Sequence, residues 1–176
     1  KGDITASQVI SGGKNNDGGL LKLGTLELSD ATIFGDVVQD KIILGGTVTN
    51  NKNMIFNKLK NNGIFSTLAD GISGDLTNDV NAELNLSGGT LNANVSGGKT
   101  NINGDVVLAS SSKIAASVVN VAENKSLTIA AGSLWNNAIS GKGTTIFGAD
   151  FDGSNNAVIE TLLTNNGVLT SNTANI

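Results

Sequence analysis

The sequence predicts an all-β chain wound as a parallel β-solenoid, and three observations carry this prediction. Apolar and polar residues alternate over short stretches, Gly or Asn interrupts them every six to nine positions, and a short phrase recurs at nearly regular spacing. Alternation with a period of two indicates half-buried strands, and repeats of roughly 20–30 residues are typical of solenoids. We therefore treat residues 1–176 as a single β-solenoid domain or fragment, with a less regular N-terminal segment at 1–23.

The alternation is clearest between residues 83 and 105. The run ELNL is followed by SGG, the run TLNANV is followed by a second SGG, and TNIN is followed by Gly104. Few windows of the chain place apolar residues at the i, i+3, i+4 and i+7 spacing of a helix, and the frequent Gly and Asn residues weaken helices. Consecutive short strands joined by tight corners are therefore expected.

A tripeptide of Gly, Thr or Ser, and an aliphatic residue marks the predicted repeat. Its spacings are 22, 43 and 43 residues, and its copies start at Gly24, Gly46, Gly89 and Gly132. These spacings fit degenerate coils of roughly 21–22 residues, about eight of them in the chain. A second phrase, Ile-x-Gly-Asp or Ile-x-Gly-Ala, does not keep phase with the first and begins at Ile33, Ile72, Ile102 and Ile146.

Gly and Asn are expected at the corners of each coil because both tolerate a positive φ. Stacked Asn side chains can also hydrogen-bond from coil to coil, and Asn-Asn pairs occur at 15–16, 50–51, 61–62, 136–137, 155–156 and 165–166. The alternative fold is a β-sandwich adhesin domain. Sandwiches usually use Pro in turns and bury several aromatic residues, whereas this chain has no Pro, no Tyr and one Trp. The composition therefore favours the solenoid.

The composition also excludes several classes of function. The chain has no His and no Cys, which excludes a Ser-His-Asp triad, an ordinary zinc site and disulfides. All 11 basic residues are Lys and the formal charge is −4, which argues against nucleic acid as a partner. Apolar stretches reach about four residues, and a membrane-spanning helix needs about 20, so no membrane insertion by this segment is expected. We expect no cofactor.

The start of the chain and its composition indicate a setting outside the cell. Lys1 is not preceded by Met and is not followed by a signal-like segment, so a processed mature form or an excised fragment is expected. The absence of Cys and a pI near 4.6 suit an extracellular or cell-surface bacterial protein.

Two runs resemble a known class of proteins. NLSGGTLNANVSGGKTNINGDVVLA at 85–109 and NKSLTIAAGSLWNNAISGKGTTIFG at 124–148 resemble the passenger regions of bacterial autotransporters and of filamentous-haemagglutinin-like exoproteins. The resemblance extends from about Gly24 onward and rests on Gly-Thr-Leu, Asn-Asn-Gly and Gly-Asp-Val phrases. It implies a right-handed parallel β-helix, export to the cell surface, and a role in adhesion or biofilm contact, with this chain as a passenger fragment.

A calcium site is weakly indicated at Asp150 and Asp152. These residues open the segment DFDGSNN, which is followed by Glu160, and alternate carboxylates with Gly can surround Ca²⁺ with oxygen atoms. The spacing departs from the EF-hand pattern, which favours an acidic Asx-type turn between coils. The segment GGKNNDGG at 12–19 is similar to glycine-rich calcium-binding repeats without their residue order, and we expect a flexible loop there.

Two pairs of aspartates are candidate catalytic groups, namely Asp36 with Asp40 and Asp75 with Asp79. Two carboxylates can act as acid and base on a glycoside. β-Helix enzymes that cleave acidic polysaccharides surround such a pair with Arg, His and Lys, and the first two residue types do not occur here. The alternative interpretation is charged side chains that keep a strand surface soluble. We therefore expect a non-enzymatic protein without catalytic residues.

Two functions remain open. The first is a surface adhesin or exoprotein passenger that presents its solenoid to a host surface or a glycan. The second is a structural subunit that self-assembles into an extracellular filament, sheath or surface layer by pairing its open coil ends with other copies of itself. The first is slightly favoured.

Overall fold

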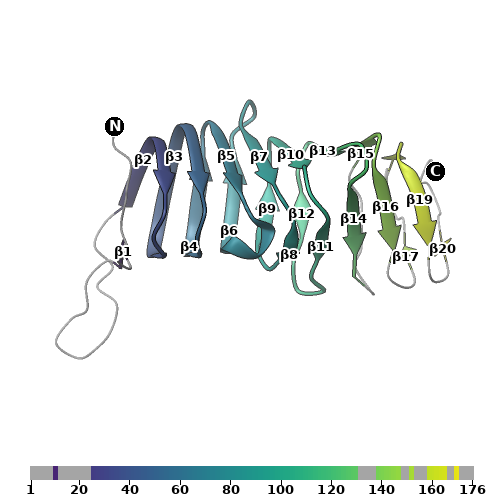
Figure 1. The fold of residues 1–176 in the computed structure, drawn as a ribbon, viewed down its shortest axis with the longest axis horizontal. Helices are drawn as coiled ribbons and strands as arrows, with labels where there is room; N and C mark the ends of the chain where they lie inside the picture. Colours follow the sequence, from purple (N-terminus) through teal and green to yellow (C-terminus); the bar gives the residue numbers. More distant parts are fainter. Residues whose placement is uncertain are drawn as a thin grey trace.

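A computed structural model describes residues 10–11, 25–130, 138–147, 151–152, 158–165 and 169–170 and shows a parallel β-solenoid of about seven turns (Figure 1). Its strands stack along the long axis of the molecule, and every pairing between the described strands is parallel. The predicted fold class is therefore confirmed. The β-sandwich alternative is wrong, because a sandwich is built from antiparallel strands.

The solenoid has up to three walls, which we call faces 1, 2 and 3, and the first coils lack a strand on face 3. Face 1 contains the first half of β3 (Val37–Asn50), β4 (Met54–Asn61), β6 (Ile72–Asn78), β9 (Asn94–Ser96) and β12 (Ile114–Ala115). Face 2 contains the second half of β3, β5 (Ile64–Thr67), β7 (Glu83–Leu86), β10 (Lys99–Ile102), β13 (Val118–Val121), β15 (Ala138–Gly141) and β18 (Val158–Ile159). Face 3 contains β8 (Gly89–Leu91), β11 (Val106–Leu108), β14 (Ser126–Ile129), β16 (Thr144–Phe147) and β19 (Leu162–Asn165).

The remaining strands lie toward the two ends of the rod. β2 (Thr25–Ile33) pairs with both halves of β3, and β1 (Ile10–Ser11) pairs with the beginning of β3. β17 (Phe151–Asp152) pairs with β20 (Leu169–Thr170). Apart from β1, the segment 1–23 that we predicted to be less regular lies outside the described residues.

Face 3 is absent from the first coils and forms further along the chain. Residues 51–53 form a short corner between β3 and β4, and one coil later the 3₁₀ turn η1 (Ala69–Gly71) occupies this side. The amide of Ala69 donates to the carbonyl oxygen of Gly88 at 2.7 Å, so η1 stacks on the turn that begins β8. The coils thus change from two walls to three.

Most coils are shorter than the spacing of the tripeptide predicts. Glu83 pairs with Lys99, 16 positions later, whereas Val106 pairs with Leu127 in one of the longer coils, 21 positions later. The spacing of the tripeptide does not give the coil length, because its copies begin strand segments on different walls. Thr25 begins β2 and pairs with Lys41 on face 1. Thr47 begins the face 2 half of β3, and Thr90 lies in β8 on face 3.

The core consists of aliphatic and aromatic side chains stacked from coil to coil. Residues in register on face 1 are Ile42, Leu59, Leu76, Val95 and Ile114, all of them buried. On face 2 the corresponding stack is Val48, Phe65, Leu84, Thr100, Val119 and Ile139. Each side chain packs on its counterpart in the next coil, so burial depends on the neighbouring coils.

The corners contain buried asparagines, as predicted for two of the Asn-Asn pairs. Asn50 and Asn61 are buried and their following residues are exposed. The Asn61 amide nitrogen Nδ2 donates to Asn78 Oδ1 at 2.9 Å, and that of Asn50 donates to the carbonyl oxygen of Gly71 at 3.2 Å. Side-chain amides therefore join successive coils. The pairs at 15–16, 136–137 and 155–156 lie outside the described residues.

Aspartates at other corners join coils through the backbone. Oδ1 of Asp36 accepts from the amide of Asn53 at 3.1 Å, and Oδ1 of Asp105 accepts from the amide of Ser126 at 3.0 Å. These contacts account for two copies of the Ile-x-Gly-Asp phrase, since each copy ends in a carboxylate that holds the next coil. Hydrogen bonds to a charged group are among the stronger ones in proteins.

Thr100 is the polar member of the apolar stack on face 2, and its replacement by valine is expected to stabilise the protein. Its side chain is fully buried and its Oγ1 atom has no hydrogen-bond partner. Thr100→Val removes this desolvated hydroxyl and should raise the free energy of unfolding by about 1 kcal/mol, measured by urea denaturation. The matched variant is Thr145→Val, whose hydroxyl bonds to Thr161 at 2.7 Å and which should destabilise instead. Equal effects of the two would contradict this account.

Candidate functional site

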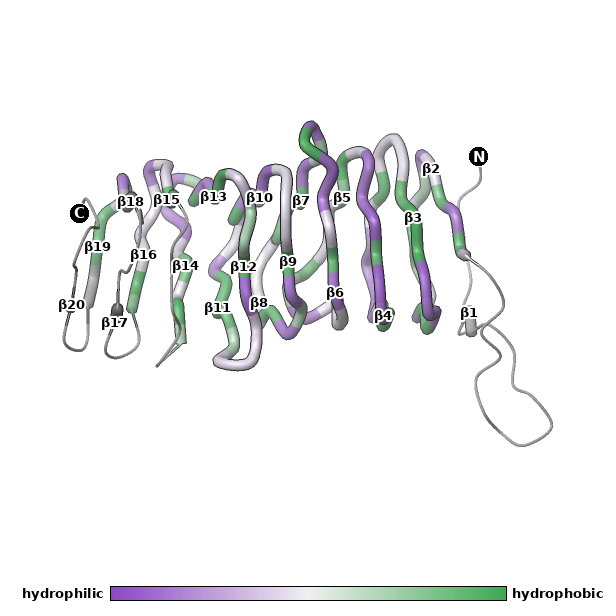
Figure 2. The backbone as a smooth tube through the Cα atoms, turned by 180° about the vertical axis from the view of Figure 1, so that it is seen from behind, coloured by the Kyte–Doolittle hydropathy of each residue, from purple (hydrophilic) through white to green (hydrophobic). Residues whose placement is uncertain are grey.

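A groove of about 620 Å³ runs across the outer surface of face 1. We call it the face 1 groove, and its lining comprises Lys41, Ile42, Lys58, Leu59, Lys60, Asp75, Leu76, Thr77, Asn94, Val95, Ser96, Lys113 and Ala115. In Figure 2 the strands of face 1 lie side by side, with hydrophilic segments recurring along β3, β4 and β6. The core residues of these strands form the floor of the groove, and outward side chains rise on both sides of it.

Strand register arranges the outward side chains in two rows. The first row contains Lys41, Lys58, Asp75, Asn94 and Lys113. The second row contains Lys60, Thr77, Ser96 and Ala115. Because parallel strands are spaced by about 4.8 Å, the first row extends for roughly 19 Å along the rod. The side chains of consecutive coils thus form one extended surface.

The groove concentrates positive charge on an acidic protein. Four of the chain's 11 lysines line it, against one aspartate, while the formal charge of the whole chain is −4. The ammonium groups of Lys41, Lys58 and Lys113 are exposed and make no ion pair or hydrogen bond with the described residues. They are therefore available to an anionic ligand.

The two remaining charged groups of the groove have partners. Nζ of Lys60 lies 3.9 Å from Oδ2 of Asp79, and both side chains are about half exposed, at 56% and 50%. Such an ion pair is weak in water. Oδ1 of Asp75 accepts from Asn94 Nδ2 at 2.9 Å, which links β6 to β9. Asp75 therefore lies in the middle of the first row as a fixed hydrogen-bond acceptor.

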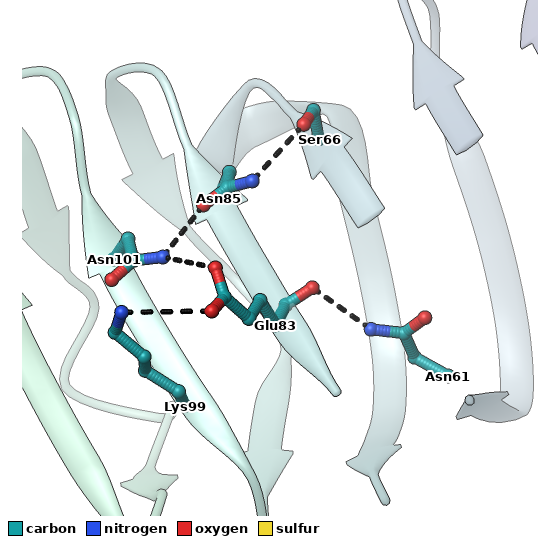
Figure 3. Close-up of polar contacts among 6 residues, drawn as sticks. All are labelled: Asn61, Ser66, Glu83, Asn85, Lys99 and Asn101. Carbon is teal, nitrogen blue, oxygen red and sulfur yellow. Dashed lines mark hydrogen bonds and ion pairs between the residues drawn. The ribbon is translucent and has the colours of Figure 1, made fainter. Parts of the chain in front are cut away.

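The polar side chains of face 2 are arranged differently, because they bind one another (Figure 3). Asn101 Nδ2 donates to Asn85 Oδ1 at 2.8 Å and to Glu83 Oε2 at 3.1 Å, and Asn85 Nδ2 donates to Ser66 Oγ at 3.3 Å. Lys99 pairs with the other carboxylate oxygen of Glu83 at 3.6 Å. The donors of this ladder bond to acceptors within it, so we assign the ladder a structural role.

The aspartate pairs that are candidate catalytic groups in the sequence are not brought together. Asp36 and Asp40 are separated by four steps of extended chain, or about 13 Å, and so are Asp75 and Asp79. Glycosidase carboxyl pairs lie about 5–9.5 Å apart. Asn57 Nδ2 donates to Asp40, and Oδ1 of Asp79 accepts from the amide of Val80 at 2.7 Å. At these separations neither pair has the geometry of a glycosidase acid and base.

The calcium site suggested by the sequence is the other candidate, at Asp150 and Asp152. Asp150 and the side chain of Asp152 lie outside the described residues, and so does the segment 12–19. Within the described ranges, no group of three or more acidic, His or Cys side chains could hold a metal ion.

The face 1 groove was missed at the level of sequence, although a signal for it exists. Lys41, Lys58 and Asp75 recur at a constant step of 17 positions, which is the local coil length. A search at the period of the tripeptide does not align them. The later members Asn94 and Lys113 follow at a step of 19 positions.

Comparison with known proteins finds no matching family model, no matching curated protein and no matching solved structure. The described residues contain no helix long and apolar enough to cross a membrane. The case for a function therefore depends on the fold and on the groove.

Proposed function

We propose that this chain is a non-enzymatic, extracellular bacterial surface protein, an adhesin or exoprotein passenger, whose face 1 groove binds an extended ligand on another surface. The observation that supports this proposal is the groove itself, which follows five consecutive coils and exposes side chains without partners. A ligand with a regular repeat can make a similar contact at each coil. The resemblance to autotransporter and filamentous-haemagglutinin-like passengers points to the same role.

Filling the groove with a bulky side chain is expected to abolish this binding. Thr77 lies exposed in the second row, and Thr77→Trp should reduce retention of the protein on polysaccharide and host-cell surfaces at least about tenfold by steric exclusion of the ligand. The measurement is a binding screen by biolayer interferometry and cell adhesion, with circular dichroism to verify the fold.

The matched control is Thr90→Trp, which adds the same side chain at an exposed position on face 3. It should bind like the parent protein. If both variants bind like the parent, the groove is not the adhesive surface. If the parent retains no polysaccharide and no cell surface, the adhesive function itself is wrong.

The second candidate function is a structural subunit that self-assembles through its coil ends. One observation favours it: within the described residues, β18 and β19 each have a strand neighbour on one side only. An unpaired parallel edge is a template for another strand. Negative-stain electron microscopy over a range of concentrations distinguishes the two functions, since uniform filaments support assembly and isolated rods support adhesion.

A further inference from the structure

The order of charges along the first row of the groove indicates what kind of ligand it accepts. Lys41 and Lys58 are followed by Asp75 and Asn94, and then by Lys113. Two cationic positions are thus separated from a third by two coils that present a carboxylate and an amide. A ligand with a negative charge at every unit would place one of its charges beside Asp75, where like charges repel.

We propose that the face 1 groove binds a sparsely charged acidic polysaccharide in which two or more neutral sugars separate successive carboxylated sugars, a proposal that rests on the adhesive function above. One ring of an extended polysaccharide advances by roughly the distance between two coils, about 4.8 Å, so consecutive sugars match consecutive strands. The free lysines bind the carboxylates. Asp75 accepts hydrogen bonds from the hydroxyl groups of the neutral sugars in between.

The rest of the lining agrees with a sparsely charged, hydroxyl-rich ligand. Thr77, Ser96 and Asn94 supply hydroxyl and amide groups on both sides of the floor. Oγ of Ser96 lies 3.2 Å from Oγ1 of Thr77, so the second row presents a continuous line of small polar groups. Such groups can donate to or accept from sugar hydroxyls.

Other polymers fit this lining less well. Nucleic acids are usually bound by arginines and by stacking on aromatic side chains, and the groove contains neither residue type. A densely charged polymer is also repelled by the net charge of −4. An extended peptide that adds to a sheet needs an open strand edge, whereas the central strands of face 1 are paired on both sides.

Neutralising the free lysines is the first test. The variant K41Q/K58Q/K113Q should weaken binding of an oligosaccharide of deacylated gellan, which carries one uronate in every four sugars, by about 10- to 100-fold in isothermal titration calorimetry. The matched control K52Q/K125Q/K142Q removes the same charge from corners outside the groove and should bind within about twofold of the parent. Binding by the parent should weaken with added salt.

Equal losses in the two triple variants would overturn the assignment to the groove while leaving an adhesive function open. Tighter binding of neutral dextran than of the gellan oligosaccharide, abolished by Thr77→Trp, would retain the groove as the adhesive site and overturn its preference for charge. Displacement of the gellan oligosaccharide by a single-stranded oligonucleotide at equal charge concentration would point to a nucleic-acid site and overturn the proposal. Failure of the parent to bind any surface would contradict both proposals.

Asp75 provides a second test that depends on the spacing of the charges. Asp75→Asn keeps a hydrogen-bond acceptor and removes the negative charge, so it should raise the affinity for polygalacturonate, charged at every sugar, by about three- to fivefold. The affinity for the gellan oligosaccharide, which presents a neutral sugar at Asp75, should change by less than about twofold. Asp70→Asn is the control, because Asp70 is exposed in η1, does not line the groove and is not paired with any of its lysines. If Asp75→Asn leaves the affinity for polygalacturonate unchanged, Asp75 does not select the ligand.

Discussion

Replacing Phe65 by alanine is expected to lower the free energy of unfolding by about 3–5 kcal/mol. Phe65 is fully buried in β5, and it packs in register between Val48 of the preceding coil and Leu84 of the following coil. The truncation removes the transfer free energy of the ring and leaves a cavity that the rigid coils cannot close. Urea denaturation followed by circular dichroism measures the loss.

The control for this prediction is in the same strand. Ile64 precedes Phe65, points to the outer side of face 2 and is 43% exposed. Ile64→Ala should therefore cost less than about 1 kcal/mol. A comparable loss in both variants would mean that the stack on face 2 does not determine stability. Because each coil contacts mainly its neighbours, Phe65→Ala should also broaden the transition, as the coils on the two sides begin to unfold separately.

Replacing Gly104 by alanine is expected to destabilise the protein by at least about 3 kcal/mol. Gly104 lies at the corner between β10 and β11, where the chain comes close to the preceding coil. A Cβ atom there would lie 1.7 Å from the carbonyl oxygen of Ser87 and 2.7 Å from the amide nitrogen of Gly88. Both are backbone atoms, so the clash can be relieved only by separating the two coils.

Gly45 provides the matched control in β3. A Cβ atom at Gly45 would approach no closer than 3.6 Å to Oγ of Ser29, and its φ is not in the left-handed region. Gly45→Ala should therefore be neutral or slightly stabilising, because alanine restricts the unfolded chain. The melting temperature and soluble yield of the two variants measure the difference. A Gly104→Ala variant as stable as Gly45→Ala would show that the coils can separate at little cost.

The fold class was predictable because its signal is local. The alternation around Leu84 and Leu86 and the SGG corners on either side of Thr90 specify short strands without reference to distant residues. Parallel stacking follows from the repeat, because successive coils run in the same direction and place equivalent strands side by side. The absence of Pro agrees with strands that are paired on both sides.

The coil length was not predictable from the same signal. A strand begins in a similar way on every wall, so the tripeptides at Thr47 and Thr90 look alike although they lie on faces 2 and 3. Coil length is set by the corners, which range from residues 92–93 between β8 and β9 to residues 109–113 between β11 and β12. Gly and Asn are common in this chain, and they do not by themselves mark which corner is which.

The candidate site depends on that length and was therefore missed as well. Lys58 and Lys113 are ordinary exposed lysines in the sequence, and only the register of face 1 places them in one row. The sequence indicates aspartates as candidate catalytic groups instead, because carboxylates have a recognisable acid–base chemistry. In the structure Asp36 and Asp105 hold neighbouring coils together, a role that no spacing in the sequence indicates.

The short reach of the pairings has a consequence for how the chain acquires its structure. A strand finds its partner a single coil away, as Glu83 does with Lys99 and Val106 with Leu127, so a completed coil is already a template for the next. The chain can therefore order itself progressively, one coil at a time, from any coil that is already folded. Each added coil buries the apolar edge of the previous one and exposes a new edge of the same kind. The rate at which the rod grows should thus depend on contacts about one coil apart, and a longer rod would need more steps of the same kind rather than a harder search for distant partners.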